Sequence, residues 1–142
     1  MRWVVLTVLT LVMLVSAGCG SEVTIVASTG NSTIVVTTVS APTISLALFR
    51  QDTAARTVFG SVDFYTSGSD VGTMTITVTN SRGSVVSRVV DDLAAFSGLT
   101  SGTIQFLIDY AAFPPDTYTV TIFVTTRAGD VSNPIYRSFI TP

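Results

Sequence analysis

The amino-acid sequence predicts an all-β protein whose main part folds as a seven-stranded antiparallel β-sandwich. From residue 43 onward, apolar and polar residues alternate in repeated short runs, the pattern of β-strands with one buried face. Turn residues such as Gly, Asn and Asp separate the runs at short intervals, and no long helical pattern interrupts them. Because about one hundred residues of this kind can bury an adequate core, 43–142 is predicted to be one domain.

The individual strands follow from the alternation. It is clearest at 73–79, where three apolar residues face one side and four threonines face the other. Turns are predicted at 67–70, 80–83 and 127–130, each containing a glycine that tolerates positive φ. One helical turn is predicted within 91–99. In chain order, the residues that define five of the strands are Ile44, Leu46 and Leu48; Val58, Val62 and Phe64; Met74, Ile76 and Val78; Ile104, Phe106 and Ile108; and Tyr118, Val120, Ile122 and Val124. A weaker strand is predicted from Val85 to Val90, and the last from Ile135 to Thr141.

Residues 1–18 are predicted to be a cleaved secretory signal peptide. A single cation, Arg2, precedes an apolar run from Trp3 to Val15, and small residues follow it. This run of about 13 residues is short for a membrane-spanning helix, which needs about 20. We therefore expect the chain to be exported, with an uncleaved anchor as the alternative.

The junction Ser16-Ala17-Gly18-Cys19 resembles the lipobox of bacterial lipoproteins, in which small residues precede a cysteine that is lipidated and becomes the mature N-terminus. The family more often has an aliphatic residue at the place of Ser16. The resemblance implies a membrane anchor through lipid on Cys19, the only cysteine of the chain. Gly20 after it implies the outer membrane in Gram-negative members. A soluble secreted protein with a free thiol is the alternative.

Residues 19–42 are predicted to link the lipidated Cys19 to the domain. Between Gly20 and Pro42 the chain is almost entirely Ser, Thr, Val, Ala, Gly and Ile, with Glu22 as its one charge. Two β-branched runs, 22–28 and 33–40, flank a turn-like Thr-Gly-Asn-Ser segment. The segment is therefore either a partly extended tether with transient strand character, which we favour, or a β-hairpin.

The C-terminal strands resemble those of bacterial Ig-like and fibronectin type III-like extracellular domains. The resemblance rests on the run Pro114 to Ile122, the loop Ala128 to Pro134 and the final strand with Phe139, and it covers residues 41–142. It implies an Ig-like Greek-key topology, with Tyr118 as a tyrosine corner that caps the core and bonds to backbone upstream. Val120 stands where an antibody domain has its second cysteine, so the resemblance is to the disulfide-free branch.

The composition excludes several kinds of chemistry. The chain has no His and no Lys, and its net charge is −2. Without His there is no Ser-His-Asp or Cys-His catalysis and no imidazole-bound zinc, and one cysteine cannot form an intrachain disulfide. Without a basic stripe to neutralise phosphates, a nucleic-acid partner is not expected. We expect no cofactor.

The strongest candidate for a binding surface is a set of threonines. In an Ig-like topology the third and sixth strands are neighbours, so Thr75, Thr77 and Thr79 are expected to lie beside further threonines on one outer face. A flat face of hydroxyls and methyls with one aromatic suits a glycan or another protein chain. A plainly solvated face is the alternative, because Thr has high β propensity. The further threonines are Thr119, Thr121 and Thr125, and the aromatic residue among them is Phe123.

Carboxylates suggest two further sites. Asp70, Asp130 and Asn133 are expected in loops at one end of the sandwich, where hard oxygen ligands could hold calcium weakly. Turns use the same residue types, and no calcium-loop spacing is present.

Asp91, Asp92 and Asp109 are the candidates for acid-base work on a glycoside, which requires two carboxylates about 5 to 9 Å apart. Asp91 and Asp92 more simply begin a turn or cap the helical stretch. The sequence thus predicts a lipid-anchored, non-catalytic binding or structural module of the bacterial cell envelope, with another envelope protein or a glycan as partner. The alternative is a carbohydrate-active enzyme or an accessory domain of one.

Overall fold

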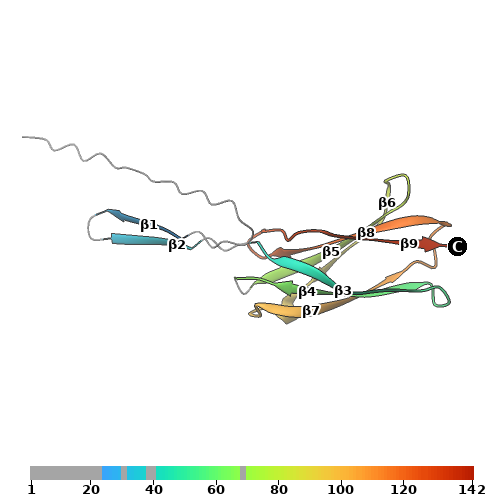
Figure 1. The fold of residues 1–142 in the computed structure, drawn as a ribbon, viewed down its shortest axis with the longest axis horizontal. Coiled ribbons are helices and arrows are strands. Elements are labelled where there is room, and N and C mark those ends of the chain that lie inside the picture. Colours follow the sequence, from blue (N-terminus) through green and yellow to red (C-terminus); the bar gives the residue numbers. More distant parts are fainter. Residues whose placement is uncertain (1–23, 30–31, 38–40, 68–69) are drawn as a thin grey trace, which may run out of the picture.

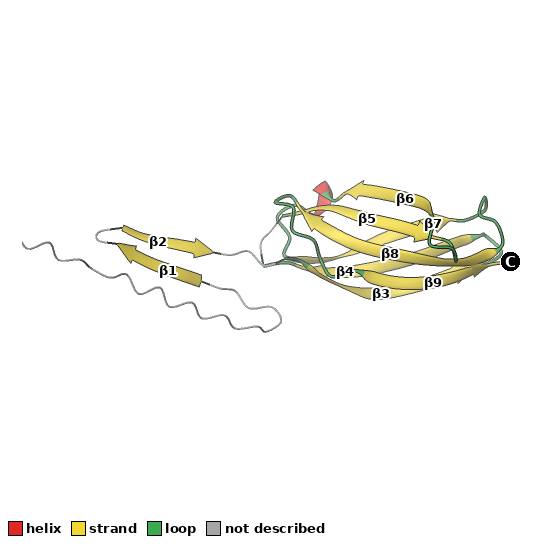
Figure 2. Ribbon diagram, turned by 90° about the horizontal axis from the view of Figure 1, so that it is seen from above, coloured by secondary structure: helices red, strands yellow, loops and turns green. Residues whose placement is uncertain are grey.

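The structure of the chain, a computed structural model, describes residues 24–29, 32–37, 41–67 and 70–142. Most of them form a sandwich of two antiparallel sheets, which Figure 1 shows as two layers. The three-stranded sheet has the order β3 (Thr43–Asp52), β4 (Thr57–Tyr65) and β7 (Ser101–Asp109). The four-stranded sheet has the order β6 (Val85–Asp92), β5 (Val71–Thr79), β8 (Asp116–Thr126) and β9 (Ile135–Thr141), which lie side by side in Figure 2.

The connections between strands are those of an Ig-like Greek key, and the predicted seven-stranded sandwich is confirmed. The chain crosses between the sheets after β4, after β6 and after β7, so that β7 returns beside β4 and β8 returns beside β5. The fourth strand of the sandwich, β6, pairs with β5. In an Ig constant-type domain the fourth strand lies beside the fifth instead.

The core lies between the two inner faces and is built from the alternating positions of every strand of the sandwich except β6. Valines of β4, β5 and β8 are fully enclosed, and a cluster of aromatic rings fills one end. The Tyr118 ring stacks on Phe139 with centroids 5.5 Å apart, and Phe139 also contacts Tyr110. Such ring pairs add to the free energy gained from burying apolar area.

The prediction that Leu48 faces the core is wrong. A β-bulge between Leu46 and Leu48 inserts an extra residue into β3, so the side-chain alternation shifts by one. Leu48 is therefore 43% exposed on the outer face, and Phe49 takes the inner position that the sequence assigned to Leu48. Phe49 pairs with Gly60, whose missing side chain leaves room for the ring of Phe106.

Short segments close the sandwich at its ends. In the turn between β5 and β6, the Asn80 side chain accepts hydrogen bonds from the amides of Arg82 and Ser84, and Gly83 has φ of 79°. The predicted helical turn is a 3₁₀ turn, η1 (Ala94–Phe96), drawn red in Figure 2. Asp92 accepts a hydrogen bond from the amide of Ala94 at the start of η1. No helix in the described part of the chain has the length and apolarity needed to cross a membrane.

Before the sandwich, β1 (Thr24–Thr29) and β2 (Ser32–Thr37) pair as an antiparallel two-stranded sheet. Thr24 pairs with Thr37, and Thr29 pairs with Ser32. This pairing corresponds to the β-hairpin, the second of the two alternatives considered for residues 19–42. The expected signal peptide at 1–18, the lipidation site Cys19 and the neighbouring Gly20 lie outside the described residues.

Candidate functional site

The predicted threonines lie together on the outer face of the four-stranded sheet. Thr77 pairs directly with Thr121, and Thr79 pairs with Thr119. Directly paired side chains on one face of a sheet are neighbours, and successive pairs on that face repeat every second residue. The face is therefore a regular grid of hydroxyl and methyl groups. We call it the threonine face, and its members are Thr73, Thr75, Thr77, Thr79, Thr119, Thr121, Phe123 and Thr125.

Thr75 differs from the other members because only 4% of its surface is exposed. Its direct neighbours across the sheet are Phe123 on β8 and Val90 on β6, both of which are larger. The other members are half-buried and reach the surface. A partner would consequently contact Phe123 and the outer threonines rather than Thr75.

The two central strands contribute no charged side chain to the threonine face. Charges begin at the neighbouring edge strand, where Arg88 pairs with Thr77 and Asp92 pairs with Thr73. On the other side, Tyr136 and Ser138 of β9 extend the face next to Thr121 and Thr119. Thr79 donates a hydrogen bond to the Thr119 carbonyl at 3.3 Å, which joins the two rows. The centre of the face thus offers hydroxyl groups, methyl groups and one aromatic ring.

Tyr118 has the geometry of a tyrosine corner. Its ring is 1% exposed, and its hydroxyl donates a hydrogen bond of 2.9 Å to the Pro114 carbonyl, four residues upstream. Burial raises the pKa of the Tyr118 phenol, and the nearby Asp116 carboxylate raises it further. The pKa of Asp116 is itself lowered by hydrogen bonds from Ser81 and from the Thr117 amide. Tyr118 therefore holds β8 in place and faces away from the threonine face.

The loop residues considered for calcium have other partners. The Asp70 carboxylate lies 3.2 Å from the Arg127 guanidinium, an ion pair that brings the β4–β5 and β8–β9 loops together as expected. Asn133 accepts a hydrogen bond from the Ile44 amide and donates one to the Ile44 carbonyl, each at 2.8 Å. Asp130 bonds to Thr126 within its own turn.

These loop residues secure the end of the sandwich at which β3 begins. The two bonds of Asn133 fix the start of β3 to the β8–β9 loop across the two sheets. In the part of the chain that the structure describes, no group of three or more acidic, cysteine or histidine side chains is placed to hold a metal ion.

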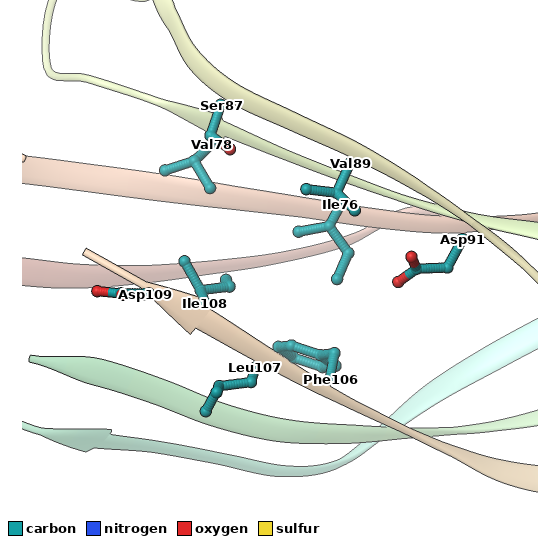
Figure 3. Close-up of a pocket in the computed structure, with 9 residues that line it drawn as sticks. All are labelled: Ile76, Val78, Ser87, Val89, Asp91, Phe106, Leu107, Ile108 and Asp109. Carbon is teal, nitrogen blue, oxygen red and sulfur yellow. The ribbon is translucent and has the colours of Figure 1, made fainter. Parts of the chain in front are cut away.

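Two of the three carboxylates considered for catalysis, Asp91 and Asp109, line a pocket between β6 and β7 with a volume of about 180 Å³. Figure 3 shows Asp91 and Asp109 at opposite ends of this pocket, separated by Ile76, Ile108 and Phe106. The Asp91 carboxylate points toward the pocket, whereas the Asp109 carboxylate points away from it. Asp109 also accepts a hydrogen bond from the Ala111 amide. The two carboxylates do not converge on one point, and Asp92 is engaged at the start of η1.

Sequence reasoning missed the exposed apolar surface beside this pocket. Val89 of β6 and Leu107 of β7 line it, with 47% and 64% of their surfaces exposed. The signal was present in the sequence, because the run Val85 to Val90 has apolar residues at adjacent positions instead of a clean alternation.

No family model matches the chain, and no curated protein does. Among solved structures, a chain titled as the apo structure of Bacteroides uniformis beta-glucuronidase 3 is similar over 75% of this chain, with 17% identity and a TM-score of 0.37. This chain spans 13% of the length of that one. A putative ApaA protein from Bordetella pertussis is similar over 70% of this chain and 91% of its own, with 15% identity and a TM-score of 0.36. Neither likeness supports a functional assignment.

Proposed function

We propose that this chain is a lipid-anchored, extracytoplasmic binding or structural module of the bacterial cell envelope. The threonine face is its contact surface, and its partner is another envelope protein or a glycan. The observation that carries this proposal is the grid of paired threonines around Phe123, uncharged over its two central strands. The solitary Cys19 after Ser16-Ala17-Gly18 supports the anchor and the location.

The chemistry of the face favours an uncharged partner surface. Threonine hydroxyls both donate and accept hydrogen bonds, and their methyl groups give apolar contact. Phe123 adds an aromatic ring of the kind that packs against apolar surfaces of partners. A sugar ring with hydroxyls and C–H groups, or a strand with small polar side chains, has matching chemistry. The two central strands offer no charged side chain on this face to balance the charge of an ionic ligand.

The position of the face also suits an anchored module. The chain enters the sandwich at the end where Asn133 holds the start of β3, so the loops with Asp70 and Asp130 lie at the tether end. The threonine face runs along the side of the sandwich, on β5 and β8. A surface on the side is open to partners in the same layer of the envelope, whereas the tether-end loops face the anchor.

Replacing Thr77 and Thr121 together by Lys tests the contact surface. These directly paired positions lie at the centre of the threonine face. The full chain, immobilised and exposed to detergent-solubilised envelope proteins or to purified envelope glycans, should lose its bound partner, because two ammonium groups would be desolvated against a partner shaped for hydroxyls. The free energy of unfolding should change by less than about 1 kcal/mol, since half-exposed strand positions tolerate such substitutions.

The matched control removes charges at the tether end without touching the sheet. The variant Asp70→Ala with Asp130→Ala should keep the partner. Loss of binding in this control, with retention in the lysine variant, would move the contact surface to the loops. Retention in both would contradict a binding role of the threonine face.

A further inference from the structure

The edge strand β6 exposes apolar side chains on both of its faces. Val85, Val86, Val89 and Val90 are 59%, 40%, 47% and 53% exposed. The pairing with β5 places Val89 on the inner side, opposite Ile76, and Val90 on the outer side, opposite Thr75. Apolar residues on both faces are typical of strands that are covered on both faces of the sheet.

An edge strand of this composition is a template for pairing. Its outer row of amides and carbonyls has no strand beside it within the described residues, because β6 ends the order of the four-stranded sheet. Proteins usually protect such edges with lysines, prolines, bulges or very short strands. The middle of β6, from Val86 to Val90, lacks these devices. The strand is eight residues long, its register shift lies at the start, beside Val85, and its one inward-pointing charge, Asp91, lies near the end.

The charges of β6 identify the partner that fits it. Two of the strand's three charges, Arg88 and Asp92, lie on its outer side, opposite Thr77 and Thr73 of β5, and the third, Asp91, lies on the inner side. In an antiparallel pair, residues directly opposite each other point to the same side of the sheet. Two copies of β6 can pair about a two-fold axis that places Val90 of one copy opposite Val90 of the other. Arg88 of each copy then stands opposite Asp92 of the other. The pairing therefore forms two opposite-charge pairs around a contact between the two Val90 side chains.

The neighbouring symmetric registers are less favourable. An axis through Val89 leaves Arg88 opposite Val90 and both charges without a partner. An axis through Arg88 places the two guanidinium groups against each other, which is destabilising for residues directly opposite in a sheet. The sequence of β6 thus complements itself in the register centred on Val90.

We propose that the chain associates with a second copy of itself by antiparallel pairing of β6 with β6, in the register that sets Arg88 opposite Asp92 of the second copy. The contact is isologous and closes as a two-fold dimer. It joins two four-stranded sheets into one of eight strands, and it makes the outer faces of the two copies continuous. The inference goes beyond the proposed function and stands whether or not the threonine face binds a partner.

A mixing experiment with charge-reversed variants tests the register. The full chain is expressed with either of two C-terminal affinity tags and purified in non-ionic detergent. Association is measured as co-purification of the chain with one tag by the chain with the other. Arg88→Asp mixed with Arg88→Asp should associate about tenfold more weakly than the parent, because two opposite-charge pairs become two like-charge pairs. Asp92→Arg mixed with itself should weaken similarly. Arg88→Asp mixed with Asp92→Arg should recover the association, because both opposite-charge pairs are then restored.

A matched control reverses a charge outside the strand. Arg82→Asp changes the same kind of side chain in the β5–β6 turn and should leave association unchanged. Recovery in the mixed pair would show that both variants are folded. It cannot come from contacts made by the N-terminal residues, since these residues are the same in all variants. A parent chain that does not co-purify with itself, or a mixed pair no stronger than the two single-variant pairs, would overturn the proposal.

Discussion

Tyr118 is the residue on which most of the aromatic end of the core depends. Its ring contacts Phe113 and Phe139, and its hydroxyl bonds to the Pro114 carbonyl just before β8 begins. A buried phenol needs such a partner, because an unsatisfied hydroxyl in the core costs free energy. The residue therefore links the β7–β8 loop to the packing between the sheets.

Removing the hydroxyl and removing the ring should have separable effects. Tyr118→Phe keeps the packing and loses one hydrogen bond, so the thermal midpoint should fall by about 4–8 °C. Tyr118→Ala also opens a cavity and should lower it by about 15 °C or more. Thermal unfolding followed by circular dichroism measures both. Equal midpoints for the parent and the two variants would contradict the corner.

At the scale of elements, β3 shows what a single inserted residue does. The bulge after Leu46 turns Leu48 outward and Phe49 inward. Phe49→Ala should therefore lower the free energy of unfolding by about 2 kcal/mol, because a packed ring is lost at the edge of the core. Leu48→Ala should change it by less than about 1 kcal/mol. Denaturant titration of the two variants compares them directly, and the reverse order of effects would mean that β3 has no bulge.

The strands could be predicted from sequence because each presents one buried face to the core. Met74, Ile76 and Val78 alternate with threonines over a full strand, and that period by itself fixes which side is inner. The bulge in β3 could not be predicted, since one extra residue in a run of Leu, Ala and Phe leaves no sign in the alternation. The weak pattern of β6 predicted a strand without showing that both of its faces are exposed.

The threonine face could be predicted in part. The topology that the resemblance implies makes the third and sixth strands of the sandwich neighbours, and this was enough to bring the two threonine rows together. The exact pairing of Thr77 with Thr121 depends on the lengths of loops, and the burial of Thr75 depends on Val90 and Phe123 from two other strands. Neither follows from the periodicity of one strand.

At the scale of the whole molecule, the sandwich has two distinct surfaces and two distinct ends. The threonine face and the β6 edge belong to the same four-stranded sheet, so a partner and a second copy would meet on one side of the molecule. The end with Asn133 and the Asp70–Arg127 pair receives the chain from the N-terminal segment. An anchor at Cys19 would hold this end toward the membrane, and confinement to a surface would favour weak contacts between copies.

The most direct test of the proposed function is the chemical state of Cys19. The chain is expressed in a Gram-negative bacterium, recovered from the envelope and examined by mass spectrometry of its N-terminal peptide. Cys19 should be the first residue and should carry a diacylglyceryl thioether with an N-acyl chain, because one acyl chain alone binds membranes only marginally. Cys19→Ala should abolish this processing. A mature chain with an unmodified Cys19 thiol, or one that begins at another residue, would contradict the lipid anchor.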